Sequence, residues 1–166
     1  MLIIFSGLPG SGKTTIARAL ARELGAVYLR IDAIEQAIRN ADASGQEMGP
    51  AGYLVAYELA RENLHLGMTV IADSVNPIRL TRDAYRDIAV KAGVPWLEVE
   101  VICSNLNMHR ERVESRSADI AGFALPDWQA VTSHDYEPWG RERLILDSAT
   151  LSVAQSVEML IAVLER

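Results

Sequence analysis

Residues 7–14 of this chain read Gly-Leu-Pro-Gly-Ser-Gly-Lys-Thr, which fits the pattern G-x-x-x-x-G-K-[ST]. The mostly apolar residues 1–5 before it predict a buried strand, and residues 14–24 carry apolar side chains at i, i+4 and i+8, which predicts an amphipathic helix. This strand–loop–helix context favours phosphate binding, because glycines let backbone N–H groups approach the oxygens and the helix N-terminus adds a positive dipole end. We therefore expect a nucleotide-binding P-loop rather than a glycine-rich turn with a chance lysine.

The P-loop supplies the first candidate site residues. Lys13 is expected to place its charge on the β- and γ-phosphates, and the Thr14 hydroxyl is expected to ligate Mg²⁺. The candidate nucleotide-binding residues of this segment are Gly7, Leu8, Pro9, Gly10, Ser11, Gly12, Lys13, Thr14 and Thr15. The implied cofactors are thus ATP and Mg²⁺.

Composition limits the remaining possibilities. A chain of 166 residues with 49% hydrophobic and 23% charged residues predicts one globular domain over residues 1–166. The net charge of −6 disfavours long nucleic acid as a partner, because binding to a phosphate backbone needs an excess of Lys and Arg. The single cysteine, Cys103, cannot form an internal disulfide, and the N-terminus lacks a basic segment, so we expect a cytoplasmic protein without a membrane partner.

Predicted strands and helices alternate along the chain. After the first strand and helix, strands are expected at 27–31, 68–72, 96–103 and 143–146. Helices are expected at 32–40, 50–66, 76–92, 105–117 and 152–164, with a polar loop at 41–49 and a short helix near 126–132. The pattern predicts a three-layer α/β P-loop NTPase fold: a five-stranded parallel sheet, helices on both faces and a helical lid over about residues 105–122. Ligands of such sheets lie at the carboxyl ends of the strands, where Asp32, Asp73 and Asp147 occur.

Four segments in this order resemble the small P-loop kinases related to nucleoside-monophosphate kinases. They are the P-loop, residues 30–32 (Arg-Ile-Asp), residues 70–77 and residues 109–116. The group includes gluconate kinase, chloramphenicol phosphotransferase and the kinase domain of polynucleotide kinase, and we expect the chain to be classed with AAA-type ATPases. The resemblance covers nearly the whole chain. It implies ATP-dependent transfer of the γ-phosphate to a hydroxyl group of a small molecule.

Asp32 is the candidate catalytic base. Its carboxylate follows the second predicted strand, where it could orient an acceptor hydroxyl and take its proton, and the resemblance assigns it this role. The alternative is an N-cap for a helix that begins at Ala33. Polynucleotide kinases tend to place an arginine three residues later, where this chain has Glu35, which weakens the case for a phosphorylated or nucleic-acid acceptor.

Asp73 and two arginines complete the predicted site. Asp73 ends an apolar strand, as a Walker B aspartate does, and is expected to hold Mg²⁺ or position the acceptor, unless it only caps a turn. Arg112 and Arg116 are four residues apart and are expected to share a helix face with His109, closing over the γ-phosphate or the adenine. The alternative is a solvated charged helix.

The acceptor pocket is the least constrained part of the prediction. The loop 44–52 and the helix face with Tyr53 and Tyr57 could wall it, although that face could equally point to the core. Likewise, the aromatic residues of the irregular stretch could cover the acceptor or merely pack; they are Trp128, Tyr136 and Trp139. Two other functions stay open: a nucleotide-binding ATPase or switch without an acceptor, and a nucleic-acid end kinase.

Overall fold

The protein is a computed structural model that describes residues 1–41 and 49–165. One parallel sheet has the strand order β2-β3-β1-β4-β5. Its strands are β1 (Leu2–Ser6), β2 (Val27–Arg30), β3 (Val70–Asp73), β4 (Trp96–Ile102) and β5 (Leu144–Asp147). The helices of the described residues are α1 (Lys13–Leu24), α2 (Ile31–Ala41), α3 (Ala51–His65), α4 (Arg79–Ala92), α5 (Leu106–Ser115), α6 (Trp128–Thr132) and α7 (Val153–Leu164). The predicted five-stranded parallel α/β fold is confirmed.

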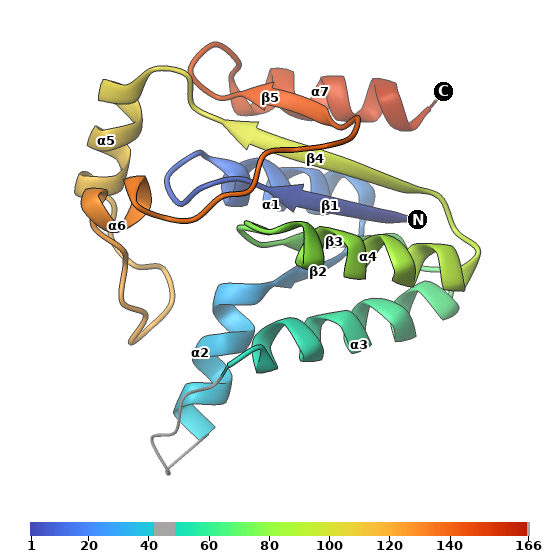
Figure 1. Cartoon of the computed structure of the whole chain (residues 1–166). Coiled ribbons are helices and arrows are strands. Elements are labelled where there is room, and N and C mark those ends of the chain that lie inside the picture. Colours follow the sequence, from blue (N-terminus) through green and yellow to red (C-terminus); the bar gives the residue numbers. More distant parts are fainter. Residues whose placement is uncertain (42–48, 166) are drawn as a thin grey trace.

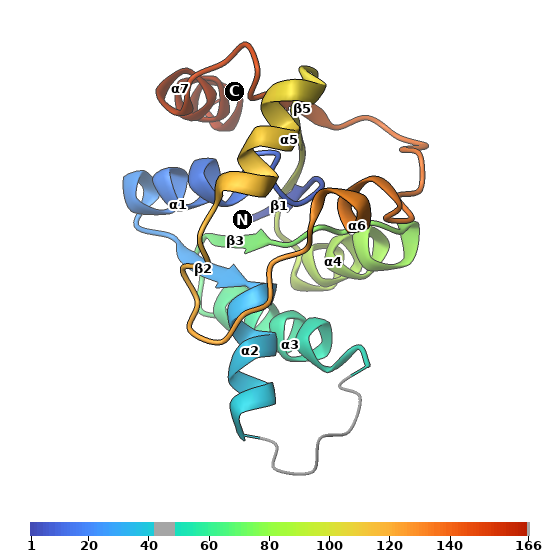
Figure 2. The same ribbon diagram turned by 90° about the vertical axis from the view of Figure 1, so that its left-hand side faces the viewer.

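Helices cover both faces of the sheet (Figures 1 and 2). On one face, Ile3 and Phe5 of β1 pack in a core with α1 and α7. On the other, Leu2 and Ile4 pack in a second core with α3 and α4. A central parallel strand buried on both faces needs apolar side chains at every position, which explains the unbroken apolar run at the N-terminus. The P-loop therefore starts from the most buried strand of the molecule.

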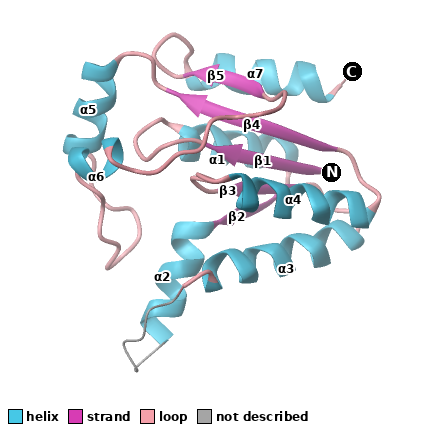
Figure 3. Cartoon of the chain, viewed as in Figure 1, coloured by secondary structure: helices cyan, strands magenta, loops and turns pink. Residues whose placement is uncertain are grey.

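The strand β4 departs from this pattern. Val99 and Val101 pack in the core with α1 and α7, whereas the alternating Glu98 and Glu100 face the other side and are buried there. The segment that joins α6 to β5 crosses this face in place of a helix, as Figures 1 and 3 show. It pairs Arg141 with Glu98, and Arg143 with Glu100. Ion pairs thus replace apolar packing at this end of the sheet.

Three predicted helix boundaries are wrong in ways that affect the site. The helix α4 begins at Arg79 rather than at residue 76, and Asn76 instead adopts φ 46° in the preceding loop. The helix α2 begins at Ile31, which places Asp32 in its first turn and not at an N-cap. The helix α5 ends at Ser115, and Arg116 has extended backbone with ψ 145°. The contacts that hold the Asn76 backbone are described below.

Other predicted features are confirmed. The short helix expected near 126–132 is α6, and Ser152 forms the expected capping box with Gln155 at the start of α7. The loop expected at 41–49, and residues 44–48 of the expected acceptor wall, lie largely outside the described residues. Within the described part of the chain, no helix combines the length and apolar composition that crossing a membrane requires.

Candidate functional site

The P-loop has a backbone that only glycine accommodates at two close approaches. Gly7 has φ 140°, and a Cβ atom there would lie 2.2 Å from the carbonyl oxygen of Val101. Gly10 has φ 81°, and a Cβ there would lie 2.5 Å from Cγ2 of Val113. Side chains at either position would therefore displace β4 or α5 as well as the loop. The loop curves tightly against its own scaffold and exposes its backbone toward a cavity.

His109 packs against the P-loop. It is buried, its Nε2 lies 2.8 Å from the carbonyl oxygen of Pro9, and its ring meets Trp128 edge-on with centroids 5.2 Å apart. His109 and Arg112 lie three residues apart on α5, whereas Arg116, expected on the same helix face, lies beyond the end of this helix. Of the two alternatives for Trp128, packing against α5 is the one observed.

A cavity of about 770 Å³ lies beside the P-loop. It brings together most of the predicted site residues, although they come from separate segments of the chain. These are Pro9, Gly10, Gly12, Lys13, Thr14, Thr15, Asp32, Arg112 and Arg116. Four predicted residues are not among those that line it: Gly7, Leu8, Ser11 and Asp73. The cavity thus contains the P-loop lysine, the candidate base and both lid arginines.

The two arginines of the predicted lid differ in their contacts. Arg112 donates from Nη1 to the Ser148 hydroxyl at 2.8 Å and from Nη2 to the Ser148 carbonyl at 3.1 Å. Arg116 lies beyond the end of α5, and its Nε and Nη2 atoms are buried without a hydrogen-bond partner. Burial lowers the pKa of Arg116, the nearby Asp32 carboxylate opposes that shift, and Arg30 adds to it. Arg112 therefore bonds to the β5–α7 connection, whereas Arg116 lines the cavity together with Asp32.

Sequence reasoning missed an ion cluster in the cavity wall. Arg30 donates from Nη1 to both carboxylate oxygens of Asp119, at 3.0 and 2.8 Å, and Arg18 reaches the same carboxylate at 2.7 Å. Hydrogen bonds from Arg30, and then from Arg18, hold the pKa of Asp119 at about 2. The Nη2 atom of Arg30 also lies 3.3 Å from the Oδ2 atom of Asp32. Asp119 is 89 residues from Arg30, so no local pattern could have signalled this contact.

Asp73 is sequestered at the end of β3. Its side chain is 1% exposed, and its Oδ2 accepts a hydrogen bond of 2.5 Å from the Tyr28 hydroxyl. Burial, and then the Asp73 charge, raises the pKa of Tyr28. The Oδ1 atom of Asp73 is buried without a hydrogen-bond partner. Asp147, by contrast, accepts hydrogen bonds from Ser104 and from the backbone of Ala149, which fits a structural role at the end of β5.

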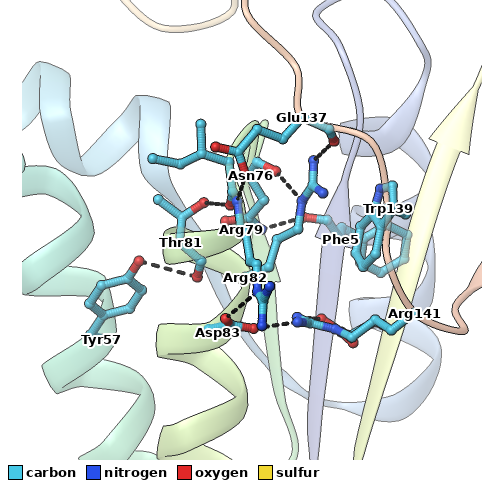
Figure 4. Close-up of polar contacts among 12 residues, drawn as sticks. Phe5, Tyr57, Asn76, Arg79, Thr81, Arg82, Asp83, Glu137, Trp139 and Arg141 are labelled. Carbon is cyan, nitrogen blue, oxygen red and sulfur yellow. Dashed lines mark hydrogen bonds and ion pairs between the residues drawn. The ribbon is translucent and has the colours of Figure 1, made fainter.

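The loop after β3 is tied to the P-loop. The Asn76 side chain is buried and donates from Nδ2 to the carbonyl oxygen of Phe5 at 2.9 Å, and the N–H of Gly7 donates to Val75 at 3.1 Å. Arg82 in turn donates from Nε to the carbonyl oxygen of Asn76 at 2.8 Å (Figure 4). These contacts fix the left-handed backbone of Asn76 and explain why a helix cannot begin there.

Arg82 is the buried anchor of this arrangement, and we expect Arg82→Met to destabilise the fold by about 2–4 kcal/mol. The guanidinium is 2% exposed, and it also donates to the carbonyl oxygens of Pro77 and Glu137, at 2.9 Å each. It lies 4.8 and 4.3 Å from the ring centroids of Tyr136 and Trp139. Methionine fills similar space but removes the Arg82 donors from the carbonyl oxygens of Asn76 and Glu137, whereas that of Pro77 still accepts from the N–H of Glu137. Denaturant unfolding measures the loss.

Arg79→Met is the matched control for Arg82→Met. The Arg79 side chain is largely exposed on the same helix and pairs only with the i+4 residue Asp83. Its loss is expected to change the free energy of unfolding by at most about 0.5 kcal/mol. Equal effects of the two substitutions would show that Arg82 does not anchor the loop.

Comparison with known proteins places this geometry among P-loop folds. The model of one family, described as an AAA domain, matches residues 2–130. The probable adenylyl-sulfate kinase of Aeropyrum pernix is 27% identical over 166 aligned residues, which cover 96% of this chain and 90% of that protein.

Two solved structures are similar to this chain over 99% of its length. The Mycobacterium tuberculosis APS kinase CysC with AMPPNP and APS has a TM-score of 0.73 at 18% identity, with 97% of that chain covered. Chaetomium thermophilum Kti12 with ADP-AlF3 has a TM-score of 0.75 at 22% identity, with 98% of that chain covered.

Proposed function

Because the chain belongs to the AAA domain family, we propose that it is a kinase that transfers the γ-phosphate of ATP to a hydroxyl group of a small molecule. The observation that carries this proposal is the shared cavity of Lys13 and Asp32. A P-loop alone serves any nucleotide-binding protein, whereas a carboxylate in the same cavity can receive the proton of an acceptor. The relative named as an adenylyl-sulfate kinase supports a small-molecule acceptor.

The donor side of the site is built on the P-loop. We propose that the loop N–H groups and Lys13 bind the ATP phosphates, since Lys13 occupies the first turn of α1 and lines the cavity. Arg112 lines the same cavity and is fixed by Ser148, against which Gly12 packs. This placement favours a role for Arg112 on the nucleotide rather than on the acceptor.

The residues present fit a Mg²⁺ ion held mainly by substrate. The described part of the chain contains no group of three acidic, histidine or cysteine side chains that could hold a metal by themselves. Thr14 lines the cavity, and we propose its hydroxyl as the protein ligand of Mg²⁺. When bound, Mg²⁺ neutralises charge on the phosphate oxygens. Asp73 stays a weaker candidate because it does not line the cavity and already bonds Tyr28.

Asp32 performs the proton step in this proposal. Its carboxylate accepts the proton of the acceptor hydroxyl while that oxygen forms a bond to the γ-phosphorus, and the bond from this phosphorus to the bridging oxygen of ADP breaks. The Nη2 atom of Arg30 lies 3.3 Å from Oδ2 of Asp32 and helps orient this carboxylate. We propose that the segment of about residues 105–122 forms the lid, which excludes water that would otherwise compete as acceptor.

A panel of alcohols, sugars, nucleosides, antibiotics and adenylylsulfate tests the proposal. Purified protein with ATP and Mg²⁺ is expected to release ADP faster in the presence of one class of compound, with a phosphorylated product detected by mass spectrometry. ADP release that no compound accelerates would favour an acceptor-free ATPase or switch. Salt-dependent binding of an oligonucleotide, with phosphorylation of its end, would instead favour a nucleic-acid kinase.

A further inference from the structure

We propose that the acceptor carries an oxyanion group, such as a sulfate, phosphate or carboxylate, and that Arg30 and Arg116 bind this group beside Asp32. The inference rests on the proposed kinase function, because it identifies the chemical class of the acceptor. It adds a second anion site to the cavity, separate from the one that the P-loop provides for ATP.

The charge of the cavity wall differs from that of the whole chain. The chain has a net charge of −6, yet the cavity is lined by five cationic side chains and only two carboxylates. The cations are Lys13, Arg18, Arg30, Arg112 and Arg116, and the carboxylates are Asp32 and Asp119. Such local concentration of one sign attracts ligands of the other sign. The proposed donor side uses Lys13 and Arg112, so the cations on the Asp32 side remain for a second ligand.

Arg116 has unused hydrogen-bonding capacity. Its Nε and Nη2 atoms are buried without a partner, although Asp32 is close enough to influence its pKa. Buried guanidinium N–H groups without acceptors are unfavourable, and two of them on one side chain match the paired oxygens of an oxyanion. Arg30 likewise has a buried Nε atom without a partner. An oxyanion would give both groups charge-assisted hydrogen bonds, which are roughly twice as strong as bonds to the oxygens of a neutral acceptor.

Asp119 occupies part of the proposed oxyanion site. Its carboxylate accepts from Arg30 and Arg18, the type of contact that an anionic ligand would make. The Asp119 side chain is 45% exposed and lies in the segment between α5 and α6, so it can leave without opening the core. Its negative charge would also repel a bound anion. Asp119 is therefore an internal competitor for the acceptor group.

Titration of inorganic sulfate tests the inference. The protein is first saturated with AMPPNP and Mg²⁺, so that the P-loop phosphate positions are filled. Sulfate is then added at constant ionic strength set with chloride, and binding is measured by calorimetry. Wild-type protein is expected to bind sulfate, and Arg116→Met and Arg30→Met are each expected to weaken binding about tenfold or more. Phosphate and acetate in place of sulfate distinguish a tetrahedral from a planar oxyanion.

Two further variants decide the interpretation. Arg110→Met removes an exposed arginine of α5 that pairs with Glu114 outside the cavity, and is expected to leave sulfate binding unchanged. Asp119→Asn is expected to tighten sulfate binding several-fold, a gain that misfolding cannot produce. Equal sulfate affinities of the Arg116→Met and Arg110→Met proteins would overturn the inference.

The binding experiment requires no phosphoryl transfer and so separates the two proposals. Sulfate binding that depends on Arg116 without any acceptor-stimulated ADP release would preserve the anion site but contradict the kinase proposal. Rapid phosphorylation of a neutral acceptor, unaffected by Arg116→Met, would preserve the kinase proposal but contradict the anion site.

Discussion

Asp32→Asn is expected to lower kcat for phosphoryl transfer by about 10²–10⁴-fold, the range typical of a lost general base. Asparagine preserves the shape of the side chain and one hydrogen-bond acceptor, but it cannot take the proton of the acceptor hydroxyl. Asp32 lies in the first turn of α2 and is not part of the P-loop, so binding of ATP is expected to change little. Initial rates of ADP release with the best acceptor of the panel measure the loss.

Asp87→Asn provides the control for this substitution. Asp87 is an exposed aspartate on α4 and does not line the cavity, so its amide variant should retain wild-type kcat. Binding of AMPPNP by both variants separates lost chemistry from lost nucleotide affinity. If the Asp32→Asn protein transferred phosphate within about twofold of the wild-type rate, the base assignment would be wrong.

Lys13→Met is expected to lower kcat by about 10²–10³-fold, as removal of one fixed donor to developing charge typically does. Lys13 is buried at the start of α1 and lines the cavity, so its charge acts where water is partly excluded. Methionine retains the apolar stem but not the ammonium group. Weaker AMPPNP binding should accompany the slower transfer.

Lys91→Met is the matched control, because Lys91 is exposed in the last turn of α4. The free energy of unfolding of both variants shows whether the fold survives. A Lys13→Met protein with normal folding, normal AMPPNP affinity and normal kcat would contradict the proposed donor site.

Local patterns predicted the framework well. Three consecutive patterns depend only on residues close together in sequence: the apolar run at the N-terminus, the glycine loop and the 3.6-residue periodicity after it. They correspond to β1, the P-loop and α1. The capping box of Ser152 and Gln155 is likewise contained within one turn. Asp32 could be predicted as a candidate site residue because it lies two residues after the end of β2, and parallel strands bring their carboxyl ends to one edge.

The errors occurred where distant residues decide local conformation. Asn76 followed by proline is a common helix opening, but its side chain bonds the Phe5 carbonyl, 71 residues away, and its backbone turns left-handed. Whether Glu35 disfavours a phosphorylated or nucleic-acid acceptor stays a prediction. The cations that line the cavity with Asp32 include Arg30, at the end of β2, and Arg116, directly after α5.

The sequence by itself determined the sheet, the phosphate-binding loop and the carboxylate that faces it, because each is encoded by residues within a few positions of one another. Only the tertiary structure decided which contacts Arg112 and Arg116 make. Arg112 and Arg116 are four residues apart, yet α5 ends between them: Arg112 bonds Ser148, and Arg116 lies beyond the helix with two buried nitrogen atoms that lack partners. Arg30 likewise pairs with Asp119, which is 89 residues away in the sequence, so only the folded chain brings these two charges together.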